Sequence, residues 1–246
     1  MQFDVNIFLQ QLFSSAYLLG ALTALGLATA SQLVAIVLGF ILAVGRTSSN
    51  RVFRGLSGAY VWFFRAIPTL LVLLIVWNAG PQLIPALTQS WYTPFLAAFI
   101  GLAIVEAAYM AEIIRSALLS IDDGQKLAAR ALGMTPWQVM RKVLIPQATR
   151  IAIPPTGNEF IGMVKYTSLA SVISLRELLT TAQVGVSVTF RYAEYYAAAI
   201  IYYLIIVSIL MIVQNRIEKN FRWTNKIAKS NKVAKAQPAA EELIAA

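Results

Sequence analysis

The 246-residue chain contains no cysteine and no histidine. Their absence excludes disulfide bonds, thiol nucleophiles, imidazole bases and most zinc sites. Charged residues are also scarce, since they make up 13% of the chain while 59% of its residues are hydrophobic. A soluble domain of this length needs a much more polar surface. The composition therefore predicts an integral membrane protein and argues against an enzyme.

Two long stretches lack charge altogether, residues 5–45 and residues 66–105. Each exceeds the ~20 apolar residues that cross a bilayer core. The pattern predicts an all-α membrane protein with five transmembrane helices in one domain, residues 16–222. A short interfacial segment, residues 1–15, precedes it, and a basic tail, residues 223–246, follows it. We expect this tail to be disordered or held against the anionic inner leaflet. The five predicted spans are about 16–44, 60–77, 93–118, 151–173 and 195–213.

The basic residues fall into blocks between the predicted spans. The segments after the first, third and fifth spans hold three, five and seven of them, whereas the loop after the fourth span holds only Arg176 and Arg191. The positive-inside rule therefore places the N-terminus outside and the C-terminus in the cytoplasm. Because the basic residues act as orientation signals and do not form one patch, the net charge of +9 does not predict a nucleic-acid partner.

The loop between the third and fourth spans is basic and helix-forming, although it lies between two apolar regions. Asp122 or Asp123 can act as the N-cap of a first helix, and Gly133 suits its left-handed C-terminal cap. Thr135, Pro136 and Gln138 then predict a second helix that begins with a capping box. Two short helices at an angle result, with an apolar face to bury. This physical pattern is compatible with an amphipathic connector on the membrane surface and with a docking element for a cytosolic partner.

The sequence pattern of this loop resembles the cytoplasmic loop of ABC-importer permeases. Ala128 and Ala129 precede Gly133 at the spacing of that loop, and Val143, Ile145 and Pro146 complete its Ile-x-Leu-Pro end. Leu127 stands where the family usually has Glu. Three further segments resemble the polar amino acid permease family in the expected order: 64–69 (FRAIPT), 108–115 (AYMAEIIR) and 158–173, which contains NEFI and KYTSLASVI with Tyr166 in place of the usual Asp.

The resemblance implies the type I ABC-importer permease fold in a bacterial inner membrane. It implies as partners a second permease subunit, identical or different, cytosolic ATP-binding subunits and a periplasmic solute-binding protein, with membrane lipid around them. The chain has no phosphate-binding Gly-x4-Gly-Lys-Ser/Thr motif, so it cannot bind ATP by that route, and no cofactor is expected. The resemblance implies an ATPase-docking surface at Ala128, Ala129, Leu132, Gly133, Trp137 and Pro146.

Ionisable residues within the spans are the candidates for transport, because charges in the membrane are costly unless they are paired or functional. Glu106 and Glu159 are predicted to line a polar path for substrate. Asn158, Thr167 and Arg65 are added as further candidates of this path. Arg65 can instead pair with a carboxylate of another span. The remaining candidates are Lys165 and the residues Glu112 and Arg115, whose spacing of three predicts a pair on one helix.

The predicted function is the transmembrane subunit of an ATP-driven importer that moves a polar amino acid, or a relative such as an opine, into the cytoplasm. The alternative is a proton-coupled transporter or channel that uses Glu106 and Glu159 as a relay. A membrane enzyme is disfavoured, because histidine and cysteine are absent, the adjacent pair Asp122 and Asp123 is expected to cap a helix, and no metal-ligand spacing occurs. A Ser-Lys hydrolase at Lys165 and Ser168 is the one enzymatic arrangement that the residues leave open.

Overall fold

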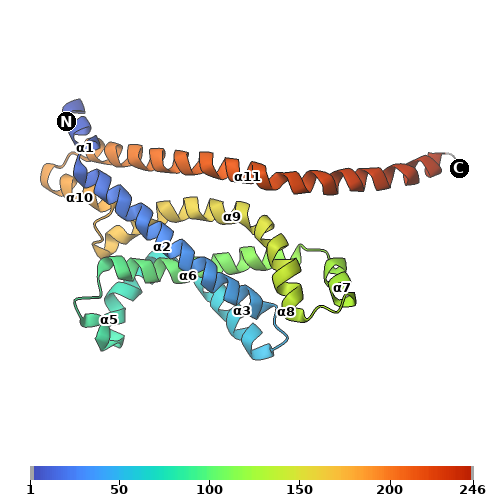
Figure 1. The fold of residues 1–246 in the computed structure, drawn as a ribbon. Helices are drawn as coiled ribbons and strands as arrows, with labels where there is room; N and C mark the ends of the chain where they lie inside the picture. Colours follow the sequence, from blue (N-terminus) through green and yellow to red (C-terminus); the bar gives the residue numbers. More distant parts are fainter. Residues whose placement is uncertain (1–2, 245–246) are drawn as a thin grey trace.

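A computed structural model describes the backbone of residues 3–244 and the side chains of residues 3–219. Every regular element in this part of the chain is helical, which confirms the predicted all-α class (Figure 1). The α-helices are α1 (Val5–Leu12), α2 (Ser15–Arg46), α3 (Arg51–Ala66), α4 (Thr69–Leu74), α5 (Gly80–Leu83), α6 (Pro94–Leu119), α7 (Asp123–Ala131), α8 (Pro136–Val139), α9 (Ile145–Tyr166), α10 (Leu178–Thr189) and α11 (Tyr192–Ile244). Shorter π-helical segments lie at Ile75–Ala79 and Met140–Leu144, and 3₁₀ segments lie at Pro85–Thr88 and Thr167–Ile173.

Helices α2 and α6 form the centre of the bundle, as expected for the first and third spans. The Thr93 side chain caps α6, and Pro94 occupies its first turn, as the sequence predicts. The two helices approach closely at Gly39, where an added Cβ would lie 2.5 Å from the Cβ of Met110. Small side chains therefore set the distance between the two central helices.

The second predicted span is not one continuous helix. Helix α3 ends at Ala66, and α4 begins at Thr69 after a bend of 102°. Pro68 causes the break, because it lacks an amide hydrogen and forces Ile67 into an extended conformation (ψ 146°). Three described helices are long and apolar enough to cross a membrane, or four if the bent pair counts as one span. Helix α9, the fourth predicted span, is not among them, because it is more polar.

Helix α10 was not predicted, since its residues were taken as part of an outer loop. Glu177 caps it by accepting hydrogen bonds from the backbone N–H groups of Leu179 (2.9 Å) and Thr180 (2.8 Å). The Glu177 side chain is buried, and Tyr203 donates to it from α11 (3.1 Å). A residue that looks like an isolated loop charge in the sequence is therefore a buried helix cap.

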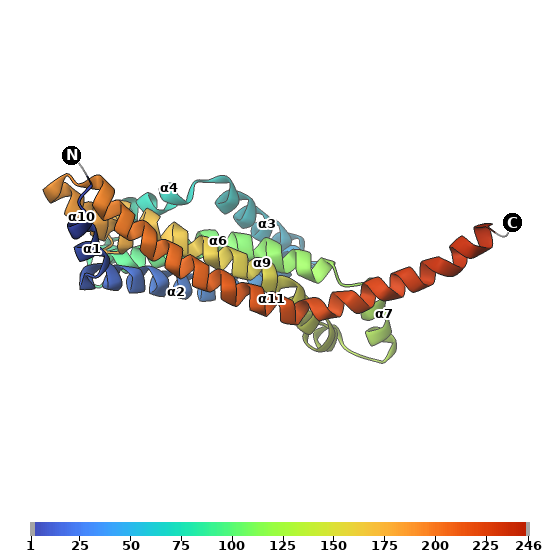
Figure 2. The ribbon, with the colours of Figure 1, turned by 90° about the horizontal axis from the view of Figure 1, so that it is seen from above.

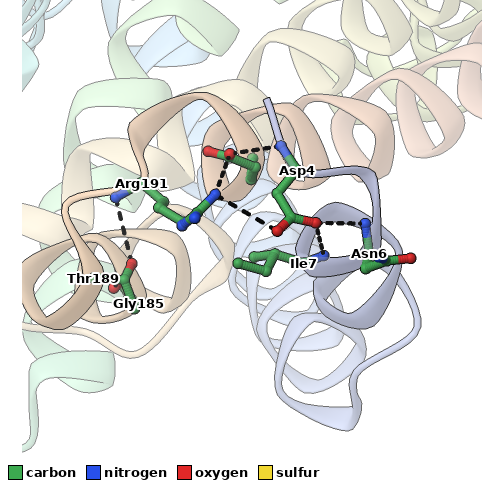
Figure 3. Close-up of polar contacts among 7 residues, drawn as sticks. Asp4, Asn6, Ile7, Gly185, Thr189 and Arg191 are labelled. Carbon is green, nitrogen blue, oxygen red and sulfur yellow. Dashed lines mark hydrogen bonds and ion pairs between the residues drawn. The ribbon is translucent and has the colours of Figure 1, made fainter. Parts of the chain in front are cut away.

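Helix α1 is tied to the start of α11, so the predicted N-terminal helix forms part of the bundle (Figure 3). The backbone N–H of Asp4 donates to Glu194 (3.0 Å), and Arg191 lies between Glu194 (3.0 Å) and the Asp4 carboxylate (3.9 Å). Tyr202 adds a hydrogen bond to the carbonyl of Leu12 (2.9 Å). These contacts join segments about 190 positions apart, while the predicted place of residues 1–15 at the membrane interface stays a prediction.

The two ends of the bundle carry different segments (Figures 1 and 2). Helices α1 and α10 lie at one end, and α7 and α8 lie at the other. Helix α11 runs along the bundle between these ends and continues beyond it, away from the N-terminus. Its backbone is helical to Ile244, which differs from the predicted disorder of residues 223–246; Ala, Lys and Glu in this tail favour a helix. The tail's contact with lipid stays a prediction.

Candidate functional site

Ionisable side chains inside the bundle form two groups along α6. The first group centres on Glu112, which pairs with Arg115 on its own helix and with Arg46 of α2. Arg65 of α3 lies 4.0 Å from the same carboxylate. Glu112 and Arg115 therefore pair as predicted, and Glu112 also joins three elements of the bundle.

The second group contains Glu106 of α6 and Glu159 of α9, which lie close enough to interact electrostatically. Glu106 is only 3% exposed, and its Oε1 atom has no hydrogen-bond partner in the described part of the chain. Among residues with described side chains, no cation lies within 4.0 Å of either carboxylate. The Gln32 side chain of α2 interacts with the Glu106 carboxyl group. A buried carboxylate without a counter-charge is costly in a membrane, so this group is the better candidate for a binding site.

Arg65 stands between the two groups. It faces Glu112 on one side, while its guanidinium carbon lies 5.6 Å from the centre of the Tyr109 ring and its charge acts on Glu159. Tyr166 lies near the same place, since its phenol interacts with Glu159, Tyr109 and Glu106. Neither tyrosine is among the site residues predicted from the sequence. Tyr109 is three residues after Glu106, and Tyr166 is seven after Glu159, so helical spacing was the available signal.

The two uncharged candidates lie in different surroundings. Asn158 is exposed and directly precedes Glu159 on α9, and consecutive residues of a helix point in different directions, so its side chain does not share the face of Glu159. Thr167 is fully buried at the start of the 3₁₀ segment, where its hydroxyl donates to the carbonyl of Val164 (2.7 Å). The structure thus brings Glu106, Glu159 and Arg65 into one region, leaves Asn158 on a different, exposed face of α9, and gives Thr167 a local bond at the end of that helix.

The loop between the third and fourth predicted spans has the local structure that the sequence predicts. Asp122 caps α7, Gly133 adopts a left-handed conformation (φ 77°), and Thr135 and Gln138 form a complete capping box. Asp123, in the first turn of α7, is exposed, and its hydrogen bond from Lys126 lowers the pKa of its carboxyl. The two short helices are therefore held by local bonds.

The predicted docking residues of this loop are mostly exposed. Leu132 is 83% exposed and Trp137 67% exposed, and Leu127 is 71% exposed. Ala129 is buried in a cluster with Leu118 and other apolar residues of α6, α8 and the π-helical segment Met140–Leu144, so it supports the loop from inside. Among the remaining predicted docking residues, Ala128, Gly133 and Pro146 are exposed. A cluster of large apolar side chains at the end of the bundle is an expected feature of a binding surface.

Comparisons with related sequences, with solved structures and with a family model relate this chain to known proteins. The chain is 41% identical over 193 residues to the probable amino-acid permease protein YxeN of Bacillus subtilis, covering 78% of this chain and 85% of that protein. It is 39% identical over 220 residues to the arginine transport system permease protein ArgU of Corynebacterium glutamicum, covering 85% of this chain and 69% of that protein. It is 41% identical to the octopine transport system permease protein OccM of Rhizobium meliloti, covering 81% and 82%.

The fold also matches a solved structure, the crystal structure of an amino acid ABC transporter with histidines. The match has a TM-score of 0.80 at 32% sequence identity and covers 89% of this chain and all of the matched one. Residues 35–223 match the family model described as binding-protein-dependent transport system inner membrane component. This match covers α3 to α10, the last twelve residues of α2 and the first part of α11, and so includes both groups of charges and the loop formed by α7 and α8. The chain therefore belongs to the family of binding-protein-dependent transport system inner membrane components.

Proposed function

We propose that this chain is the membrane-spanning subunit of an ATP-driven importer for a polar amino acid or a close relative such as an opine. The observation that carries this proposal is the pair of carboxylates at Glu106 and Glu159, with Arg65 beside them. Family membership and the relatives named for amino acids, arginine and octopine support it. A second permease subunit, cytosolic ATPases and an external solute-binding protein complete the proposed transporter.

The acidic pair and Arg65 together suit a zwitterion. An α-ammonium group supplies the cation that Glu106 and Glu159 lack, and the Arg65 guanidinium binds a carboxylate. The tyrosines at 109 and 166 add neutral hydrogen-bonding groups for a polar side chain. Thr167 acts on this site by fixing the end of α9.

The loop formed by α7 and α8 is the proposed ATPase-docking element. Its exposed apolar side chains Leu127, Leu132 and Trp137 would fill a hydrophobic groove of the ATPase. Because α6 precedes the loop and α9 follows it, movement of the loop reaches both carboxylates. The loop and the C-terminal tail are proposed to face the cytoplasm, and the N-terminus the outside, in agreement with the distribution of basic residues.

Uptake by the reconstituted complex tests the substrate site. Glu106→Gln and Glu159→Gln keep the size of each side chain but remove its charge, and we expect each to reduce uptake of a labelled amino acid at least tenfold, since a charge-assisted bond is worth about 1.5–3 kcal/mol. Asp123→Asn, which removes an exposed carboxylate, is the matched control. Full uptake by both glutamate variants, at normal assembly, would overturn the assignment of the site.

Co-purification with the ATPase tests the docking element. Leu132→Asp places a charge on the apolar surface, and we expect it to abolish co-purification. Leu83→Asp changes a similarly exposed leucine in α5, at the opposite end of the bundle from α7 (Figure 1), and should have no effect. Retention of the ATPase by Leu132→Asp would refute the docking assignment, and ATP-independent uptake driven by a proton gradient would instead favour the proton-coupled alternative.

A further inference from the structure

Helix α9 contains an unusual combination of residues halfway between the cytoplasmic loop and Glu159. Pro154 and Pro155 lie inside the helix, and Gly157 follows them. Since neither proline has an amide hydrogen, the carbonyls of Arg150 and Ile151 lose their usual partners in the helix. This position is therefore the weakest point of the backbone of α9.

Helix α11 contacts this weak point through one polar side chain. Gln214 is 7% exposed, and its Nε2 atom donates to the carbonyl of Pro154 (2.9 Å) and to the carboxylate of Glu218 (3.0 Å). Gly157 provides the space, because a Cβ at this position would overlap the Gln214 Oε1 atom. A glutamine amide, a proline carbonyl and a glycine thus fit together across two helices.

The packing around this contact is open on one side. A cavity of about 620 Å³ lies between α2, α6, α9 and α11, and Thr156, Gly157, Gln214 and Ile217 form part of its wall. The wall is otherwise almost entirely apolar. The cytoplasmic half of α9 therefore has room to move relative to the half that carries Glu159, and Gln214 supplies a fixed contact at the junction.

We infer that Gln214 is a positioning residue for transport, which holds the Pro154–Gly157 junction of α9 to α11. With this contact in place, displacement of the cytoplasmic loop moves the Glu159 segment instead of being absorbed as bending at the prolines. This inference rests on the proposed function, since it concerns how movement of the ATPase-docking loop reaches the substrate site. Gln214 acts through α9 and is not itself a substrate ligand.

Coupling of ATP hydrolysis to uptake distinguishes this role from simple stabilisation of the fold. The full complex is reconstituted in proteoliposomes, and uptake and ATP hydrolysis are measured in the same preparation. For Gln214→Leu we expect normal hydrolysis but about fivefold less uptake per ATP, the change that loss of one hydrogen bond makes in a two-state equilibrium. A purely structural role would lower both rates together, in proportion to the amount of assembled complex. A value of uptake per ATP equal to that of the wild type, whether or not both rates fall, would overturn the inference.

Two further variants test whether Gln214 and Gly157 form one unit. Gly157→Ala displaces the glutamine without removing it, and we expect the same loss of uptake per ATP. The double variant Gly157→Ala/Gln214→Ala relieves the clash and should equal Gln214→Ala alone, because the contact can be lost only once. Additive losses in the double variant would overturn the inference.

A matched control and the wild-type complex separate this inference from the proposed function. Asn78→Leu removes an amide that donates to a carbonyl of its own helical segment (3.0 Å), and it should leave the ratio unchanged. If the wild-type complex takes up substrate with ATP but the Gln214 variants couple normally, only the present inference fails. If the wild-type complex shows no ATP-dependent uptake, the proposed function fails, and this inference fails with it.

Discussion

Replacement of Glu112 by glutamine should destabilise the bundle more than any other single loss of charge discussed above. This carboxylate faces Arg46, Arg65 and Arg115, which come from α2, α3 and α6. The side chains of Glu112, Arg46 and Arg115 are each only about a quarter exposed. Glu112→Gln keeps the shape but leaves the guanidinium groups facing one another without a counter-charge.

The magnitude follows from the contacts that are lost. A hydrogen bond to a charged group contributes about 1.5–3 kcal/mol, and removal of one partner of a buried ion pair costs about 3–5 kcal/mol. Partial exposure of the group lowers these values, and the glutamine oxygen still accepts one bond. We therefore expect a loss of about 3 kcal/mol, with Arg115→Gln costing about half as much because Arg46 remains paired.

Thermal unfolding of the purified protein in detergent measures the effect. For a chain of this size, ~3 kcal/mol corresponds to a decrease in Tm of about 6–12 °C. Asp123→Asn removes an exposed carboxylate that also pairs with a basic residue three positions away, and it should not change Tm measurably. A Tm for Glu112→Gln equal to that of Asp123→Asn would refute the view that Glu112 joins the three helices.

Three other predictions concern packing, pH and the N-terminal helix. Gly39→Ala places a Cβ against Met110 and should cost about 1–3 kcal/mol, whereas Gly26→Ala, where a Cβ meets nothing within 4 Å, should not lower Tm. Burial raises the pKa of the Glu177 carboxyl above its ordinary value of 4.5, so the folded state binds this proton more tightly than the unfolded chain. The Tm of the wild type should therefore fall relative to the Tm of Glu177→Gln as the pH rises from 4.5 toward the raised pKa. A difference between the two Tm values that stays constant with pH would contradict this. Tyr202→Phe should speed amide hydrogen exchange in α1 about fivefold by removing its bond to that helix, and unchanged exchange would argue against the tie.

Local features of this fold could be predicted from the sequence because they depend on a few neighbouring residues. The capping box of Thr135 and Gln138, the left-handed Gly133 and the start of α6 after Thr93 each need only residues within four positions. The long apolar helices α2 and α6 follow from composition in the same way. The family resemblance, carried by four short segments, is confirmed by the match over residues 35–223.

The second predicted span and helix α10 were predicted incorrectly, because average hydrophobicity and local backbone signals favoured different structures there. Hydrophobicity favoured a continuous span through residues 60–77, but Pro68 breaks it, and the rule for the residue before a proline was sufficient to predict this. Helix α10 has only twelve residues, too few for a span, and its cap Glu177 looked like a loop charge. In both cases a local signal was present and was given less weight than the average polarity.

Long-range pairing could not be predicted, because charge alone does not specify a partner. The sequence placed Arg65 either in the substrate path or in a pair with another span, and the structure shows it near Glu112 and acting on Glu159. Arg46, sixty-six positions from Glu112, was counted only as an orientation signal. Such contacts depend on how the helices cross, which local patterns do not determine.

The contrast between Glu106 and Glu112 explains why a single helix carries both a structural and a candidate binding carboxylate. Both lie on α6, less than two turns apart, so hydrophobicity and helical position do not distinguish them. Glu112 is neutralised by guanidinium groups from the chain itself, whereas Glu106 is more deeply buried and faces a second carboxylate. A carboxylate that is paired with a cation of the chain itself stabilises the fold, whereas a carboxylate without such a partner can bind a cationic group of a ligand. In the proposed transporter a zwitterionic cargo would provide that cation, so substitution of the unpaired carboxylate, and not of the paired one, should affect uptake without an equal effect on stability.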